Sequence, residues 1–240
     1  MKQIVSIILI LIIISCENSL KENQVIKVDY KGALKNIMRK GDLSAKFDLT
    51  EFQETKNLFA LGAIENLKGE IQIFNGMPFN TFVQDDSIIF DNTYSKKATL
   101  IVNSIVEDWK TFPIPNHVKS MSDLEEHIEI MAKENQINIK EPFPFLIEGK
   151  PESLDWHIIN WKDGDTDHTH EKHIKSGLHG TIQDQEVEML GFYSDSHHAI
   201  FTHHTTNMHI HMRMKNGEIA GHVDDLKIGN GMVLKLPGIN

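Results

Sequence analysis

The chain contains 240 residues and has a formal net charge of −10 when its 14 histidines are counted as neutral. It shows no basic stripe, so nucleic acid is not an expected partner. After a leader segment at the N-terminus, about 225 residues remain, enough for one large domain or two small ones with a proper hydrophobic core.

Residues 1–15 have the pattern of a lipoprotein signal peptide. Lys2 precedes an apolar run from Ile4 to Ile14, whose eleven residues are too few to cross a bilayer core of about 30 Å as a helix. Cys16 follows the run and is the only cysteine, so no disulfide can form within the chain. We expect cleavage before Cys16 and lipidation of its thiol. The alternative is an incidental cysteine after a plain secretory signal.

A lipid on Cys16 predicts where the protein resides. The anchor would hold it on a membrane of the cell envelope, outside the cytoplasm, and this lipid would be its only attachment to the membrane. The polar residues 16–24 are then a short tether between the lipid and the fold.

Residues 25–141 form the first of two predicted parts. A short helix is predicted from Tyr30 to Lys40 and ends at Gly41. Asn75-Gly76 lies between two apolar stretches, which is a strong signal for a β-hairpin. The β-branched segment Thr99–Val106 favours a further strand.

The clearest predicted helix of this part runs from Ser122 to Asn135. Ser122 and Glu125 match a capping box, which marks a helix start. The apolar side chains of this segment recur at helical spacing and predict a face turned to the core: Leu124, Ile128 and Met131.

Residues 142–240 form the second predicted part, which begins where Pro142 and Pro144 break the pattern. Val187–Tyr193 and Met232–Leu236 are predicted strands. Ahead of them, the polar segment 163–180 holds four histidines: His168, His170, His173 and His179. We expect a solvated loop near the functional site, because no spacing rule of a structural zinc site is met. A second metal patch is the alternative.

Three histidines near the C-terminus form the candidate metal site. His209 and His211 are two residues apart in an apolar segment, so on a β-strand both imidazoles point to one face. Lys215–Glu218 has turn residues, and Ile219–Val223 is predicted to return as the second strand of a hairpin and bring His222 beside them. Three imidazoles with one open position are typical of catalytic Zn²⁺, although other divalent transition metals also bind imidazole. Ordinary histidines without a metal are the competing interpretation.

Several motifs resemble the bacterial α-acetolactate decarboxylases. In the C-terminal half these are Gly191-Phe192-Tyr193, His209-Ile210-His211 and Gly221-His222-Val223, with the same eleven-residue gap between the last two histidines. In the N-terminal half, Leu67-Lys68-Gly69-Glu70 matches a leucine-x-glycine-glutamate that enters a strand and hairpin. The resemblance implies that the three histidines bind zinc and that Glu70 is catalytic. On the residue alone, Glu70 would be an edge-strand carboxylate that faces water.

The sequence departs from the family pattern at three places. His157 occupies the position of an arginine that handles the substrate carboxylate, and an imidazolium is a weaker, pH-dependent replacement for a guanidinium. Ala63 replaces a small hydroxyl residue. The family has a further glutamate beyond its leucine-proline, here Leu236-Pro237, and the sequence after that pair contains none.

The resemblance implies a two-part α+β fold with mixed β-sheets, a C-terminal hairpin that carries the metal site, and often a homodimer. The implied reaction is decarboxylation of the β-keto acid 2-acetolactate to acetoin through a metal-stabilised enediolate, with Glu70 as the proton-handling carboxyl. His157 is then the candidate group for the leaving carboxylate, and Arg213, two residues beyond His211, is a further candidate. The rival function is a non-catalytic, histidine-rich lipoprotein that binds metal.

Overall fold

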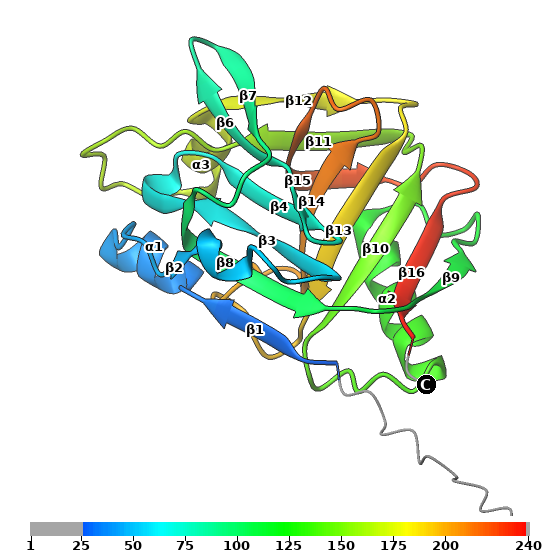
Figure 1. The fold of residues 1–240 in the computed structure, drawn as a ribbon. Helices are drawn as coiled ribbons and strands as arrows, with labels where there is room; N and C mark the ends of the chain where they lie inside the picture. Colours follow the sequence, from blue (N-terminus) through cyan, green and yellow to red (C-terminus); the bar gives the residue numbers. More distant parts are fainter. Residues whose placement is uncertain (1–25, 239–240) are drawn as a thin grey trace, which may run out of the picture.

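The computed structural model describes residues 26–238 of the chain (Figure 1). The predicted signal peptide of residues 1–15, the predicted lipidation at Cys16 and the predicted tether of residues 16–24 lie outside the described residues.

The N-terminal half forms an eight-stranded sheet with the strand order β1-β8-β3-β4-β6-β7, in which β2 pairs with β8 and β5 pairs with β4. Its strands are β1 (Val28–Lys31), β2 (Phe47–Asp48), β3 (Leu58–Ile64), β4 (Glu70–Phe74), β5 (Met77–Pro78), β6 (Asn80–Gln84), β7 (Ser87–Asp91) and β8 (Lys97–Ile105).

A second eight-stranded sheet follows, with the order β12-β11-β15-β14-β13-β10-β16-β9. Its strands are β9 (Trp109–Pro113), β10 (Phe143–Gly149), β11 (Ser153–Ile158), β12 (Leu178–Ile182), β13 (Val187–Tyr193), β14 (Met208–Met214), β15 (Ala220–Lys227) and β16 (Val233–Pro237). The chain enters this sheet at Trp109, so β9 and the helix after it lie with the second sheet, ahead of residue 142. The two-part division at residue 142 stays a prediction.

Helices are few and short in residues 26–238. The helical elements are α1 (Leu34–Lys40), α2 (Met121–Glu134), α3 (His170–Lys175) and the 3-10 turns η1 (Leu49–Phe52) and η2 (Glu65–Leu67). As predicted, α1 ends at Gly41, whose left-handed φ of 58° lets its backbone N–H reach back to carbonyls of the last turn.

The strand pairing corrects one expectation. The resemblance implied mixed sheets, but every pair of named strands is antiparallel. Hairpins explain this result: tight turns such as Asn75-Gly76, where both residues have positive φ, can join only antiparallel neighbours. The fold is therefore mostly antiparallel β, with few helices.

The two sheets pack face to face (Figure 1). Leu61 of β3 and Phe74 of β4 belong to the same buried cluster as Leu190 and Phe192 of β13. Because side chains alternate along a strand, Ile71 and Ile73 point to the other face of the first sheet, where they form a separate cluster. Each sheet thus has one face directed at the other sheet.

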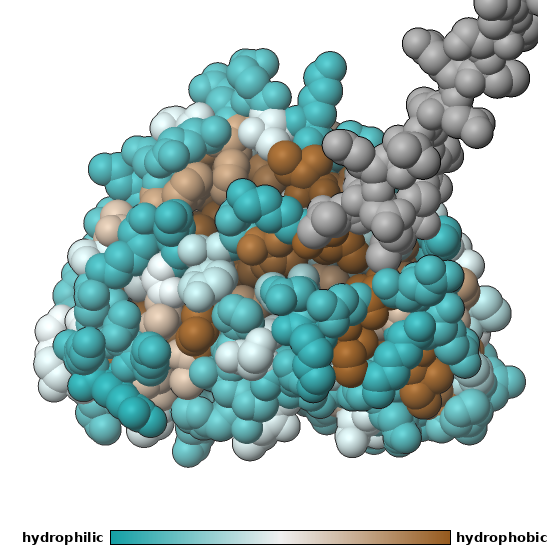
Figure 2. Space-filling model, turned by 90° about the horizontal axis from the view of Figure 1, so that it is seen from below, coloured by the Kyte–Doolittle hydropathy of each residue, from teal (hydrophilic) through white to brown (hydrophobic). Residues whose placement is uncertain are grey.

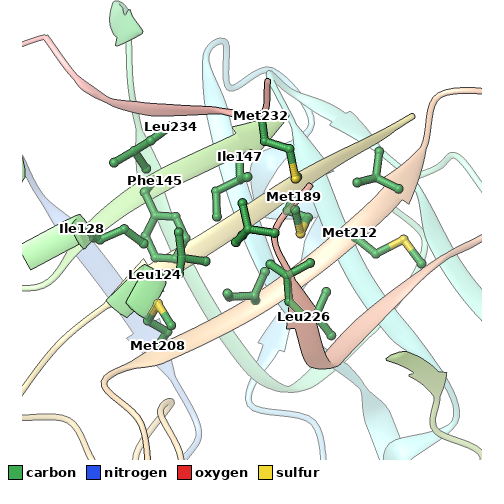
Figure 3. Close-up of a cluster of buried hydrophobic side chains, with 14 of the residues drawn as sticks. Leu124, Ile128, Phe145, Ile147, Met189, Met208, Met212, Leu226, Met232 and Leu234 are labelled. Atoms are coloured by element: carbon green, nitrogen blue, oxygen red, sulfur yellow. The ribbon is translucent and has the colours of Figure 1, made fainter. Parts of the chain in front are cut away.

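Helix α2 covers the outer face of the second sheet (Figure 3). Leu124 and Ile128 of the helix are fully buried against strand residues that include Phe145, Met189 and Met212. The predicted capping box was wrong by two residues: Ser120 is the N-cap, and Asp123 completes the box. Asp123 accepts the backbone N–H groups of both Lys119 and Ser120, contacts that Glu125 is too far along the helix to make.

Hydrophilic residues cover most of the face shown in Figure 2, and hydrophobic residues are visible between them towards its middle. The large hydrophobic side chains that are exposed among residues 26–238 are scattered singly: Tyr30, Met77, Ile105 and Ile130. None of the described helices combines the length and the apolar character needed to span a bilayer.

Candidate metal centre

The three histidines predicted as metal ligands lie together between the two sheets. His209 and His211 are on β14 and point to its inner face, because Met208, Ile210 and Met212 alternate with them and belong to the outer core. The predicted hairpin is present: β14 and β15 are adjacent and antiparallel, and His222 is directly opposite His211. Cross-strand neighbours in such a pair have Cβ atoms about 5 Å apart, which brings the imidazoles together.

The spacing of the imidazole nitrogens fits a single metal ion. One ligand atom from each histidine lies within 4.8 Å of the other two. The Nε2 atoms of His209 and His211 are 3.3 Å apart. Two nitrogens bound to one tetrahedral zinc at bond lengths of about 2.05 Å would be separated by roughly 3.3 Å. The nitrogens of His209 and His211 are therefore already at the separation of two zinc ligands.

Gln72 of β4 fixes the tautomer of His211. The Gln72 side-chain NH₂ donates to the carbonyl of Phe79 and to Thr81 Oγ1, so its oxygen faces His211 Nδ1 at 3.1 Å. That nitrogen must then carry the proton and donate it. His211 Nε2 is left with a free lone pair directed towards His209, as a metal ligand requires.

Asp224 likewise orients the rings of two other histidines through their Nδ1 atoms. Its carboxylate lies 2.8 Å from Nδ1 of His157 and 3.1 Å from Nδ1 of His222. Burial alone would raise the pKa of Asp224, but these two hydrogen bonds outweigh it and hold the pKa well below its usual range. Asp224 is therefore an anion that accepts from both Nδ1 atoms, and this contact sets the orientation of each ring, with Nε2 as the other nitrogen of His222.

The central imidazoles are neutral. Burial lowers the pKa of both His209 and His211 well below the ordinary value of 6.5, and the neighbouring histidines lower each pKa further. Neutral imidazoles have the lone pairs that bind a divalent cation. At His209 and His211, one ring nitrogen is therefore free of a proton and available to a metal.

Glu70 faces this cluster from the other sheet. It starts β4, and its Oε2 lies 3.8 Å from His211 Nε2, while its Oε1 accepts the backbone N–H of Ile159 at 3.1 Å. Burial raises the pKa of Glu70 from 4.5 to about 7, against the opposing effects of His222 and of the Ile159 N–H. Its carboxyl is therefore divided between acid and carboxylate near neutral pH, as suits a proton-transfer group. The edge-strand alternative for Glu70 is excluded by this burial.

His157 also joins the cluster. It lies on β11 directly opposite His222, and its Nε2 is 3.7 Å from Glu70 Oε1. Gly221 makes the close approach of β11 and β15 feasible, since a Cβ at that position would lie 2.5 Å from the His157 carbonyl oxygen. Any larger residue at 221 would push the two strands, and with them the two histidines, apart.

Two neighbouring cavities, which share several lining residues, lie against the histidines. A small inner pocket of about 60 Å³ is bounded by Glu70, His157, His211 and Ala63, the residue that replaces the family's hydroxyl. A larger outer cavity of about 660 Å³ shares His209 and His222 with it. The reacting groups of a substrate would therefore meet Glu70 in a narrow space, with a wide approach outside it.

The histidine-rich segment 163–180 reaches the site in part. His170 and His173 line both cavities, whereas His179 is exposed on β12. His168 and His173 contact each other at 3.0 Å and pack around Trp161. The alternative of a second metal patch finds no support, because no group of three ligand atoms among the described residues includes a histidine of this segment.

Arg213 does not belong to the cluster. Its guanidinium donates to Glu188 Oε2, with a distance of 2.7 Å from Nε, and lies over the ring of Phe79. It shares the inner face with His211, as the spacing predicts, but it lines neither of the two cavities.

No protein-family model and no curated protein matches this chain. Solved structures do. A Staphylococcus aureus protein of unknown function similar to α-acetolactate decarboxylase is 18% identical, with 87% of this chain and 84% of that chain covered and a TM-score of 0.69. The α-acetolactate decarboxylase of Bacillus subtilis strain 168 is 15% identical, with coverages of 89% and 86% and a TM-score of 0.71. The chain has an α-acetolactate decarboxylase-like fold.

At such low identity, the likeness to the decarboxylases extends to the fold alone. The local chemistry must be judged from this chain's own residues. Sequence reasoning missed three of them: Gln72, Asp224 and His203. The first two could have been found, because each lies two residues after a predicted site residue on the same strand. His203 comes from a loop, and its ring centroid is 5.9 Å from that of His222.

Proposed function

We propose that this protein is a metal-dependent decarboxylase that converts 2-acetolactate to acetoin. The proposal rests on one observation above all: three buried histidine side chains from the second sheet and a buried carboxyl from the first line one pocket. Three nitrogen ligands and a separate acid–base group are the components that a β-keto acid decarboxylase needs.

His209, His211 and His222 would hold the metal, for which Zn²⁺ is the first choice because the ligands are all imidazoles and two of them already have nitrogens 3.3 Å apart. When bound, the ion supplies a Lewis acid that stabilises negative charge on the substrate's oxygens. Gln72 and Asp224 contribute by orienting the ligands, since each holds an Nδ1–H and so directs an Nε2 lone pair inwards.

Glu70 handles the proton. Decarboxylation breaks the bond between the carboxylate carbon and C2 of the substrate, and the electron pair passes to the adjacent ketone to form an enediolate. The Glu70 carboxyl then donates its proton to C2, which yields acetoin, and a proton from solvent restores the acid. The Ile159 N–H holds Oε1, so Oε2 is the oxygen directed at the histidine cluster and at the reacting carbon.

His157 is our candidate for the leaving carboxylate. Asp224 holds its Nδ1, and its Nε2 points into the same pocket as Glu70. Because Asp224 accepts the Nδ1 proton, Nε2 can donate to a carboxylate only when the ring is an imidazolium, and it then offers one hydrogen bond, fewer than the fork of a guanidinium offers. We further propose that a lipid on Cys16 tethers the enzyme to a membrane of the cell envelope.

The test combines two measurements on the purified chain: its metal content and its formation of acetoin from 2-acetolactate. We expect close to one zinc per chain together with turnover. Several loosely bound metal ions without turnover would overturn the decarboxylase and favour the rival function, a lipoprotein that captures metal through its histidines.

A further inference from the structure

The outer cavity is larger than 2-acetolactate requires. Its volume of about 660 Å³ lies in the range of roughly 300–1,000 Å³ that accommodates drug-sized ligands. 2-Acetolactate is a small acid with only a methyl group on C2, and its reacting atoms would occupy the region shared with the inner pocket. Most of the outer cavity would then remain unfilled, which suggests that the substrate has a longer side chain.

Two cationic side chains line this outer cavity. Lys35 and Arg39 are four residues apart on α1 and therefore lie on the same side of that helix. Both are exposed, and neither forms an ion pair or a side-chain hydrogen bond with any residue in the range 26–238. The other arginine of the chain, Arg213, is bound to Glu188. Arg39 is thus the guanidinium still available to a ligand.

The acidic residues of the same cavity are engaged by the protein itself. Glu125 accepts the backbone N–H of Asn207 at 3.0 Å, Asp224 accepts two histidines, and Asp225 accepts the N–H of Leu226 at 2.9 Å. These carboxylates keep their negative charge, and the only lysine and arginine side chains in the described lining of this cavity are those of Lys35 and Arg39 on α1. These two cations are complementary to an anion.

We propose that, among 2-acetyl-2-hydroxy acids, of which 2-acetolactate has the shortest side chain, the site prefers those whose side chain ends in a second anionic group, a carboxylate or a phosphate, bound by Lys35 and Arg39. This inference rests on the proposed decarboxylase function. It divides the site into two regions: the histidines and Glu70 act on the hydroxy-keto acid, and the cations of α1 select the far end of the side chain.

The test compares kcat/KM for two substrates that differ only in the charge of the tail. The first is 2-acetyl-2-hydroxypentanedioate, which ends in a carboxylate, and the second is its tail amide. We expect the wild-type protein to prefer the carboxylate by on the order of tenfold or more, since a hydrogen bond to a charged group contributes about that much. Arg39→Gln should reduce this ratio by about tenfold, and Lys35→Gln should also reduce it.

Lys40→Gln is the matched control, because Lys40 follows Arg39 on α1 but does not line the cavity. For this variant, the ratio of kcat/KM for the carboxylate to kcat/KM for the amide should equal that of the wild-type protein. A wild-type ratio near one, or a ratio that survives the double replacement of Lys35 and Arg39, would overturn the proposal. A substrate with a phosphate tail extends the comparison, and whichever anion has the higher kcat/KM identifies the natural group.

A binding measurement separates this proposal from the decarboxylase itself. 2-Hydroxy-2-methylpentanedioate and its tail amide lack the ketone, so they cannot be decarboxylated, and their affinities can be measured by calorimetry. Tighter binding of the diacid that depends on Arg39, without turnover of any substrate, supports the anion site and refutes the decarboxylase. Turnover of 2-acetolactate with equal affinities for the two ligands refutes the anion site alone.

Discussion

His211 Nε2 and Glu70 Oε2 lie 3.8 Å apart, although the two residues belong to different sheets. Gln72, two residues after Glu70, holds the other nitrogen of the same imidazole at 3.1 Å. In the proposed mechanism, strand β4 thus contributes both the proton-transfer group and the group that orients a metal ligand. The packing of β4 against β14 would then hold both groups in place.

The first prediction concerns the metal ligands. Replacement of His209, His211 or His222 by alanine should lower the metal content well below one per chain, because each contributes one of three nitrogens to a single ion. Elemental analysis of the purified variants provides the measurement. His117→Ala, at an exposed histidine before α2, is the control and should retain its metal. Full metal content in all three variants would place the metal elsewhere.

The second prediction separates proton transfer from metal binding. Glu70→Gln keeps the shape and one acceptor for the Ile159 N–H, but it has no proton to donate at neutral pH. We expect an intact metal content and a loss of turnover of about a hundred- to ten-thousand-fold. Near-normal acetoin formation by this variant would show that the assigned mechanism is wrong, whatever the metal content. Glu51→Gln, at an exposed position, is the matched control.

The third prediction tests the orienting carboxylate. Asp224→Ala leaves the Nδ1–H groups of His157 and His222 without their acceptor. Loss of such a partner typically lowers metal affinity by about 10–100-fold, and we expect that range in a chelator competition titration. Asp225→Ala removes the next carboxylate, which contacts neither histidine, and its metal affinity should match that of the wild-type protein. If the Asp224 variant bound the metal as tightly as the wild type, Asp224 would not be needed to orient the histidine ligand.

The fourth prediction concerns stability in acid. Burial lowers the pKa of His173 from 6.5 to about 4. Between these values the unfolded chain binds a proton that the folded chain does not, so the stability contributed by neutral His173 is present above pH 6.5 and is lost as the pH falls towards 4. His173→Gln should therefore lose less stability between pH 7 and pH 5 in thermal unfolding. At pH 8 His173 is neutral in the folded and in the unfolded state, so the difference in stability between the variant and the wild type at that pH reports only the packing of the side chain. If the stability of the variant fell as much as that of the wild type between pH 7 and pH 5, protonation of His173 would not be a cause of the loss of stability in acid.

The fifth prediction addresses the anchor. Cys16→Ser should release the protein from membranes or leave its signal peptide uncleaved, because the lipid has no other thiol to modify. Membrane fractionation and the mass of the N-terminus measure this directly. Membrane association with normal processing in the variant would refute lipidation at this position.

Local patterns in the sequence determined much of the second sheet. The spacing of His209 and His211, the turn at Lys215–Glu218 and the return of His222 all follow from the two-residue period of strands and from turn chemistry, and the structure contains that hairpin. The same local rules located the end of α1 at Gly41 and the hairpin turn at Asn75-Gly76. They failed at the start of α2, where two overlapping capping patterns competed and the contacts of Asp123 decided.

The tertiary structure alone decided what faces the hairpin. Glu70 and Gln72 approach His211 because the two sheets stack inner face to inner face, and no local pattern specifies which strand of one sheet lies over which strand of the other. Nor does a local pattern specify that Lys35 and Arg39 lie beside the outer cavity. It also does not specify that the guanidinium of Arg213 pairs with Glu188. The two-residue period of a strand determines to which face of its sheet a side chain points. Which residues it contacts on the other sheet depends on how the two sheets pack so that the apolar faces of both are buried.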